Sequence, residues 1–287
     1  MSGKSKPDYK AVMRAIKELL TGEIIIGGRQ YTGIFKLKQI DASGNKYDTY
    51  LLKDGQKVKT YLREKHPERN VDKIVCDYKK KLTNAEIDPE QKLPVDEWRI
   101  KLWKEAIENG SPVSSQLAKE VYELWKTTRL QGIYFTEEVK TLLVELRKNH
   151  WLVLMTNGDS KVQREKVLMC KAEDYFDGII ISGDHPHAKP HPSIYEVAFK
   201  MFSVNPKQCI MIGDNLKTDI QGGLNSGLSC NIWINPSEAE PSGCDPEPCF
   251  SIPSVLQLQE VLDTVLKKKS RSLTHTWEVS LMSILTF

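Results

Sequence analysis

The chain has 287 residues, of which 40% are hydrophobic and 28% are charged, and its formal net charge is +3. This length can bury a full core in one large domain or two modest ones. The charge is too nearly balanced to require nucleic acid or an anionic membrane as a partner. No apolar run approaches the roughly 18 residues of a membrane helix, so we expect a soluble protein.

The cysteines and the first residues of the chain favour a reducing compartment. None of the six cysteines forms a Cys-x-x-Cys pair, and Cys209 and Cys230 lie in apolar runs where free thiols act as small hydrophobic groups. The segment 1–7 has no apolar signal core. We therefore expect a cytoplasmic protein.

The segment 1–57 is atypical and receives no assignment. Residues 8–20 can form a short amphipathic helix. Residues 31–40 alternate between apolar and charged positions, as Phe35 and Leu37 are flanked by Lys36 and Lys38. This alternation is typical of a half-exposed strand and not of a central parallel one.

Residues 58–132 read as helices only and are predicted to form a helical cap. Their apolar stripes include Ile74, Tyr78, Leu117, Val121, Leu124 and Trp125. Basic side chains are interleaved with acidic ones and no RNA-binding motif accompanies them. A solvated helical face is therefore favoured over a nucleic-acid surface.

Residues 133–267 alternate helix and buried strand, which predicts an α/β core with a doubly wound parallel sheet. Thr136 caps a helix with apolar residues at helical spacing, and the continuous apolar run 151–155 follows as a strand. Further strands are expected at 178–181, 209–212 and 230–234, with helices at 161–169, 193–202, 218–225 and 254–266. The tail 268–287 continues no pattern of this core, and we expect a frayed extension.

Polar residues suited to phosphate follow the first of these strands. Thr156, Asn157 and Gly158 place a hydroxyl, a carboxamide and a permissive turn before a helix begins. Lys189 lies in a proline-flanked loop, where a cation could neutralise a phosphate. A plain strand-to-helix turn and a solvated lysine are the alternatives.

A second group could instead bind a metal around the same loop, formed by Asp184, His185, His187 and His191. Their spacing matches no specific zinc pattern, so this alternative is weaker.

Two carboxylates mark the end of the strand 209–212. Asp214 follows Gly213, and Asp219 lies where the next helix begins. An acidic residue after a buried strand is costly unless a cation or hydrogen bonds compensate, and such a cluster can hold Mg²⁺ beside a phosphate. Helix capping by one of the two is the alternative.

Taken together, strand-Thr-Asn-Gly, loop Lys-Pro and strand-Gly-Asp-x4-Asp resemble the haloacid dehalogenase superfamily of phosphatases. The similarity covers roughly residues 62–266. It implies a haloacid dehalogenase-like α/β core with a helical cap. The implied phosphate-binding residues are Thr156, Asn157, Gly158 and Lys189, Mg²⁺ is the implied cofactor with Asp214 as its ligand, and the implied catalytic residues are Lys189 and Asp219, the latter orienting the metal shell.

Three stretches, 117–131, 156–166 and 218–228, carry the resemblance to members that act on a sugar phosphate. The implied activity is Mg²⁺-dependent hydrolysis of N-acylneuraminate 9-phosphate in sialic acid synthesis, through an aspartyl-phosphate, with the cap selecting the substrate. The only implied partner is this small molecule, with no nucleic acid and no membrane.

The family also requires an apolar strand ending in Asp-x-Asp ahead of the cap, whose first Asp attacks phosphorus. Asp41 follows a charged strand and its second carboxylate is replaced by Ser43, while Asp48 follows no apolar strand. We therefore expect an impaired phosphatase. The alternatives are a catalytically silent phosphate-ligand-binding or regulatory protein, or a phosphatase of another small phosphomonoester.

Overall fold

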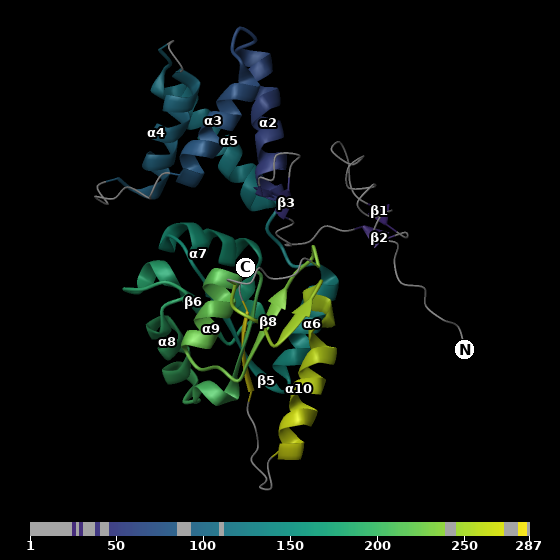
Figure 1. Cartoon of the computed structure of the whole chain (residues 1–287). Helices are drawn as coiled ribbons and strands as arrows, with labels where there is room; N and C mark the ends of the chain where they lie inside the picture. The colour runs from purple at the N-terminus through teal and green to yellow at the C-terminus, as the bar shows by residue number, and fades with distance from the viewer. Residues whose placement is uncertain are drawn as a thin grey trace.

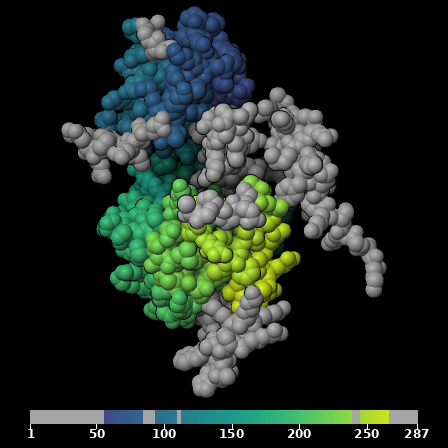
Figure 2. Space-filling view, in the orientation of Figure 1, coloured from purple at the N-terminus to yellow at the C-terminus, as the bar shows by residue number. Residues whose placement is uncertain are grey.

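A computed structural model describes residues 25–26, 29–30, 38–40, 46–84, 93–108, 112–238, 245–272 and 281–285. A helical cap stands over an α/β core with one six-stranded sheet, and the space-filling view shows the two stacked one above the other (Figures 1 and 2). The expected fold class, a haloacid dehalogenase-like α/β core with a helical cap, is confirmed.

The cap consists of α2 (Thr49–Lys65), α3 (Val71–Asn84), α4 (Val95–Glu108) and α5 (Ser115–Gln131). Helix α2 begins before the boundary at residue 58 that the sequence indicated. The predicted apolar stripes point inward, and the rings of Tyr78 and Trp103 stack with their centroids 3.7 Å apart. The cap therefore has an apolar core of its own.

The surface of the cap pairs its basic side chains with acidic ones. Lys59 and Arg63 both contact Asp72, and Lys81 contacts Glu105, at distances of 2.6 to 2.9 Å. The interleaved charges of the sequence therefore form ion pairs on this surface.

The core sheet has the strand order β6-β5-β10-β7-β8-β9, and every pairing in it is parallel. The predicted strands are found as β5 (His150–Thr156), β6 (Gly178–Ile181), β7 (Cys209–Gly213) and β8 (Cys230–Ile234). The short strand β9 (Phe250–Ile252) was not predicted. The strands run towards the cap (Figure 1), so their carboxyl ends share the edge that faces it.

Helices cover both faces of the sheet, as a doubly wound fold requires. Figure 1 shows α6 (Glu137–Arg147) and α10 (Leu258–Ser272) on one face, and α8 (Pro192–Phe202) and α9 (Gln221–Asn225) on the other. Alternate residues of β5 pack into two different apolar clusters, with Leu152 and Leu154 in one and Val153 and Met155 in the other. Burial on both faces explains why the strand reads as a continuous apolar run.

The strand β10 (Leu281–Leu285) corrects the expectation that residues 268–287 form a frayed extension. Residues 268–272 complete α10, and β10 lies in the middle of the sheet. Leu285 pairs with Leu154 of β5 on one side and with Ile212 of β7 on the other. The segment was missed because residues 268–287 do not continue the alternation of helix and strand, although Leu281–Leu285 is as long as other strands that were predicted.

The residues before the cap form two small antiparallel pairs outside the six-stranded sheet. They are β1 (Ile25–Ile26) with β2 (Arg29–Gln30), and β3 (Lys38–Ile40) with β4 (Lys46–Asp48). Asp48 therefore ends a strand that takes no part in the central sheet. The predicted helix 8–20 and the candidate Asp41 lie outside the described residues.

The described cysteines are free thiols. Cys170, Cys209 and Cys230 are buried, as expected for the last two, whereas Cys76 and Cys249 are exposed. None of the helices in the described part of the chain is both long and apolar enough to cross a membrane.

Asp96 of α4 joins the cap to α7 (Ser160–Met169) of the core. Its carboxylate accepts a hydrogen bond from Tyr122, lies 3.2 Å from the ammonium of Lys126 and pairs at 2.5 Å with Lys161. Lys126 in turn pairs with Glu165 of α7 at 2.6 Å. Partial burial opposes ionisation of Asp96, but the bonds from Lys161, Tyr122 and Lys126 outweigh it and lower its pKa to about 2.

We expect this network to weaken in acid. Because the folded-state pKa of Asp96 is depressed, its carboxylate stabilises the native state above the unfolded-state pKa of about 4, and the contribution is lost as the pH falls towards 2. Urea unfolding of the unaltered chain and of Asp96→Asn should therefore differ most above pH 4 and converge near pH 2. Glu97→Gln, an exposed change on the same helix, is the control. A difference that does not depend on pH would contradict the assignment.

Candidate phosphate site at the carboxyl edge of the sheet

The residues after β5 are held by hydrogen bonds within the protein. The hydroxyl of Thr156, which is 4% exposed, donates to Oε1 of Gln163 at 3.2 Å. The Gly158 N–H donates to the Ser182 hydroxyl at 2.9 Å, and its φ of +137° is a conformation that favours glycine. The turn that the sequence predicted is therefore also a fixed structural element.

Asn157 clamps the loop that carries Lys189. Its side-chain Nδ2 donates to the carbonyl oxygen of Lys189 at 2.9 Å, and its Oδ1 accepts the Lys189 N–H at 3.0 Å. Both polar atoms of the carboxamide are thus bonded to one backbone unit. In this arrangement Asn157 positions Lys189.

Lys189 links the end of β5 to the turn that follows β7. Its ammonium donates to the carbonyl oxygen of Met155 in β5 at 2.8 Å and pairs with Asp219 Oδ1 at 2.9 Å. Both side chains of this ion pair are 3% exposed. A charge so far from water requires an opposite charge and hydrogen bonds, and this pair supplies both.

Asp219 lies in the π-helical turn η4 (Leu216–Ile220), which follows β7. Its carboxylate also accepts the Asn215 N–H at 3.0 Å and the Thr218 hydroxyl at 3.2 Å. Gly213 is essential to this packing, because a Cβ there would lie 2.4 Å from Asp219 Oδ2. The glycine before Asp214 therefore makes room for the second carboxylate.

Asp214 is half-buried at the carboxyl end of β7, and its backbone carbonyl accepts a hydrogen bond from the Trp233 indole at 3.1 Å. Its carboxylate has no hydrogen bond among the described residues. Asp214 is thus the acidic side chain at this edge best placed to meet a ligand, whereas Asp219 is already paired with Lys189.

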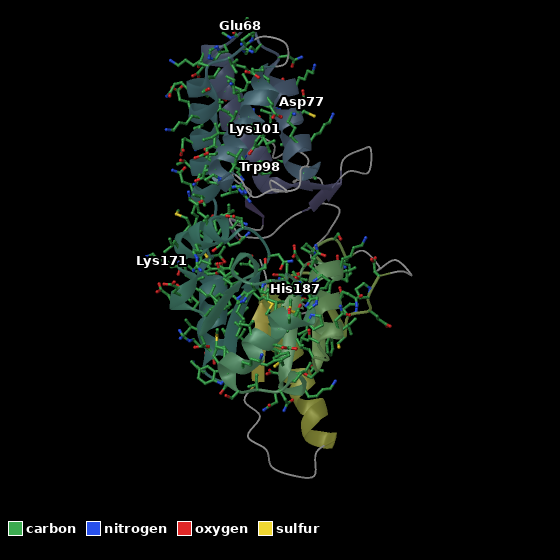
Figure 3. All side chains as sticks on the ribbon, turned by 90° about the vertical axis from the view of Figure 1, so that its left-hand side faces the viewer. Glu68, Asp77, Trp98, Lys101, Lys171 and His187 are labelled. Atoms are coloured by element: carbon green, nitrogen blue, oxygen red, sulfur yellow. The ribbon has the colours of Figure 1, made fainter. Side chains whose placement is uncertain are left out.

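The alternative metal site around the same loop gains no support. Asp184 pairs with Arg164 at 2.6 Å and with the Ser160 hydroxyl at 2.5 Å, while the rings of His187 and His191 stack on each other. Figure 3 shows His187 on the core, below the cap. Within the described ranges, no three His, Cys, Asp or Glu side chains gather as a metal cluster.

Three residues of the site were not foreseen, namely Gln163, Tyr195 and Ser182. Gln163, one turn into α7, bonds Thr156 and also donates to the Asn157 carbonyl oxygen at 3.0 Å. The Tyr195 hydroxyl donates to the Asp219 carbonyl oxygen at 3.3 Å. Ser182 was the most accessible to sequence reasoning, because it directly follows the predicted strand 178–181 at the same edge of the sheet.

The matching family model, haloacid dehalogenase-like hydrolase, covers residues 51–227. The chain belongs to this family of hydrolases, and the mammalian relatives that match 74% of it are phosphatases.

N-acylneuraminate-9-phosphatase from Homo sapiens is 38% identical over 213 residues, which is 74% of this chain and 86% of the human protein. The enzyme of the same name from Rattus norvegicus is 39% identical over the same shares. Pyrimidine 5'-nucleotidase YjjG from Escherichia coli is 33% identical over 125 residues, 42% of this chain and 54% of that protein.

Solved structures agree on the fold. A 2-haloacid dehalogenase from Pseudomonas syringae superposes with a TM-score of 0.54 and 24% identity, covering 75% of this chain and 91% of its own. The hydrolase YfnB from Bacillus subtilis, solved with bound magnesium, gives a TM-score of 0.53 at 21% identity over 73% of this chain and 91% of its own.

We expect the pair of Lys189 and Asp219 to be strongly coupled in stability. Lys189→Met leaves a buried carboxylate without this cation, which typically costs about 3 to 5 kcal/mol of unfolding free energy. Lys189→Met combined with Asp219→Asn removes both charges and should cost less than the single change. Denaturant unfolding of the two single variants and the double variant measures the coupling. Additive losses would show that the pair does not hold the site together.

Proposed function

We propose that this chain binds a phosphomonoester at the carboxyl edge formed by β5, β10 and β7. The observation that carries the proposal is the buried ammonium of Lys189, which bridges the end of β5 and the turn after β7. A phosphate that reaches this edge meets a cation, the Thr156 hydroxyl and a low local dielectric, all of which favour a bound anion. Asn157 and Gly158 hold the loop and the turn in place.

Magnesium would be held by Asp214. Mg²⁺ commonly binds through one or two carboxylates together with substrate phosphate oxygens and waters, and the carboxylate of Asp214 fits that use. When bound, the ion would neutralise charge on the phosphate. Asp219 supports the site indirectly, because its carboxylate pairs with the Lys189 ammonium and accepts the Asn215 N–H.

The substrate we propose is N-acylneuraminate 9-phosphate, an intermediate of sialic acid synthesis. The mammalian relatives that carry this activity in their names match the chain across both cap and core. We propose the cap, 58–132 with the earlier turns of α2, as the part that selects the sugar, and 133–267 with β10 as the catalytic part. Another small phosphomonoester is the alternative, since a pyrimidine 5'-nucleotidase also matches.

We propose further that the chain is impaired in turnover. In the sheet, the strand between Thr156 and Asp214 is β10, which is followed in the sequence by Thr286 and Phe287. Neither of these side chains is a carboxylate that could attack phosphorus. Loss of the nucleophile can lower turnover on the order of a million-fold in other hydrolases. A phosphate-ligand-binding protein without turnover is therefore the second candidate.

A cytoplasmic location completes the proposal. Free thiols at Cys76 and Cys249 are exposed, and exposed free thiols persist best in a reducing compartment.

The test compares binding with turnover. With Mg²⁺ and N-acylneuraminate 9-phosphate, calorimetry should detect binding, while phosphate release should be slower than that of the human relative by roughly a million-fold. Asp214→Asn should abolish the Mg²⁺ dependence of binding, and Asp184→Asn, at the ion pair with Arg164, should leave it unchanged.

Two results would contradict the proposal. Phosphate release near the rate of the human relative, lost in Asp214→Asn, would show that the chain is not impaired. Absence of binding to this substrate and to a panel of small phosphomonoesters would remove the phosphate site itself.

A further inference from the structure

The strand β10 lies in the middle of the sheet, although it comes after the other strands of that sheet in the sequence. Without β10, the remaining strands fall into two separate groups, β6-β5 and β7-β8-β9. All five residues of β10 are paired with β5, and four of them are paired with β7 as well. One short terminal segment therefore fills a slot that is open to hydrogen bonding on both sides.

The walls of this slot select an apolar strand. Leu152, Val153, Leu154 and Met155 of β5 are at most 2% exposed, and Cys209 to Ile212 of β7 are fully buried. Both faces of the sheet are covered at these positions by apolar clusters. Any segment that enters between them must be extended, parallel and apolar on both faces.

The register fixes where the next residues of such a strand lie. Leu285 is opposite Leu154 and Ile212, and two positions further along the flanking strands are Thr156 and Asp214. In a strand that continues in this register, the second residue after the paired stretch is level with both. A carboxylate there would lie beside the edge that carries the Lys189 ammonium.

We propose that the slot between β5 and β7 is a strand-acceptor site that exchanges β10 for a parallel apolar strand of another chain, one with a carboxylate two residues beyond the paired stretch. Insertion of a strand into a sheet is an established mode of peptide recognition. The partner differs from a second copy of this chain, because Phe287 occupies the corresponding place in the sequence.

The catalytic part of this inference rests on the proposed function. An oxygen of the supplied carboxylate forms a bond to phosphorus while the bond from phosphorus to the sugar oxygen breaks, and the sugar leaves as an alcohol with a proton from solvent. Water then hydrolyses the acyl phosphate, which releases phosphate and restores the carboxylate. The full site would then be shared by two chains.

The experiment uses the full chain with a substitution that weakens the pairing of β10. A fluorescent peptide with the sequence of β10 is then added. Ile284→Pro removes a backbone N–H from a central strand, where proline is otherwise excluded, and Ile284→Val is the control that keeps it. The peptide is Leu-Met-Ser-Ile-Leu-Thr-Asp with an amidated C-terminus. The side chain of its Asp is then the only carboxylate of the peptide. A version ending in Asn and a scrambled sequence serve as peptide controls.

We expect the Asp and Asn peptides to bind Ile284→Pro at least tenfold more tightly than the scrambled peptide, measured by fluorescence anisotropy. Binding to Ile284→Val should be at least tenfold weaker, because an intact β10 competes from within the chain at high effective concentration. Only the Asp peptide should raise the Mg²⁺-dependent release of phosphate from N-acylneuraminate 9-phosphate, by at least a hundredfold over the chain alone.

The outcomes separate the two proposals. Binding of both peptides without phosphate release supports the strand-acceptor site and contradicts the catalytic part of the inference, while the phosphate-binding proposal is tested separately by calorimetry. Equal binding of the copied and scrambled peptides, or dimerisation of Ile284→Pro without peptide binding, overturns the acceptor site. If circular dichroism shows that Ile284→Pro is unfolded, the unaltered chain is incubated with excess labelled peptide, and failure to co-elute overturns it.

Discussion

The parallel pairing of β10 with β5 and β7 is the constraint on which the core depends. The two groups of strands that it joins carry the two halves of the proposed phosphate site, Thr156 on one side and Asp214 on the other. Their separation is set by the width of a single strand, about 4.8 Å on each side. The distance between the two sides of the proposed site is therefore set by the pairing of the strands and not by any single side chain.

The ion pair of Lys189 and Asp219 adds a second connection across the same gap. The lysine comes from the loop after β6, is fixed by Asn157 and bonds the end of β5, while the aspartate belongs to the turn after β7. Burial makes this pair costly to break and does not by itself make it stabilising. Its evident structural effect is to hold an ammonium in one place at an edge where a phosphate could approach.

The sequence predicted the strands β5 to β8 well, because burial on both faces produces continuous apolar runs. Thr156, Lys189 and Asp219 lie at one edge of the sheet, after β5, β6 and β7, while their roles there remain predictions. The hydrogen-bond partners of these residues could not be predicted. Nothing in the spacing of the sequence shows that Asn157 bonds the backbone of Lys189 or that Gln163 bonds Thr156. The position of β10 was missed for a related reason: local pattern indicates that a segment can be a strand and does not indicate which slot it fills.

The late position of β10 has a consequence for how the protein is made. Leu281 pairs with His150, so the centre of the sheet joins residues about 130 positions apart, a long-range contact of the kind that slows folding. The cap can form during synthesis from its own apolar cluster, because its helices precede the core in the chain. The sheet cannot close until residue 285 has left the ribosome. Until then β5 and β7 present unpaired edges, so a nascent chain is exposed to chaperones and to foreign strands for the whole time that its core takes to be translated.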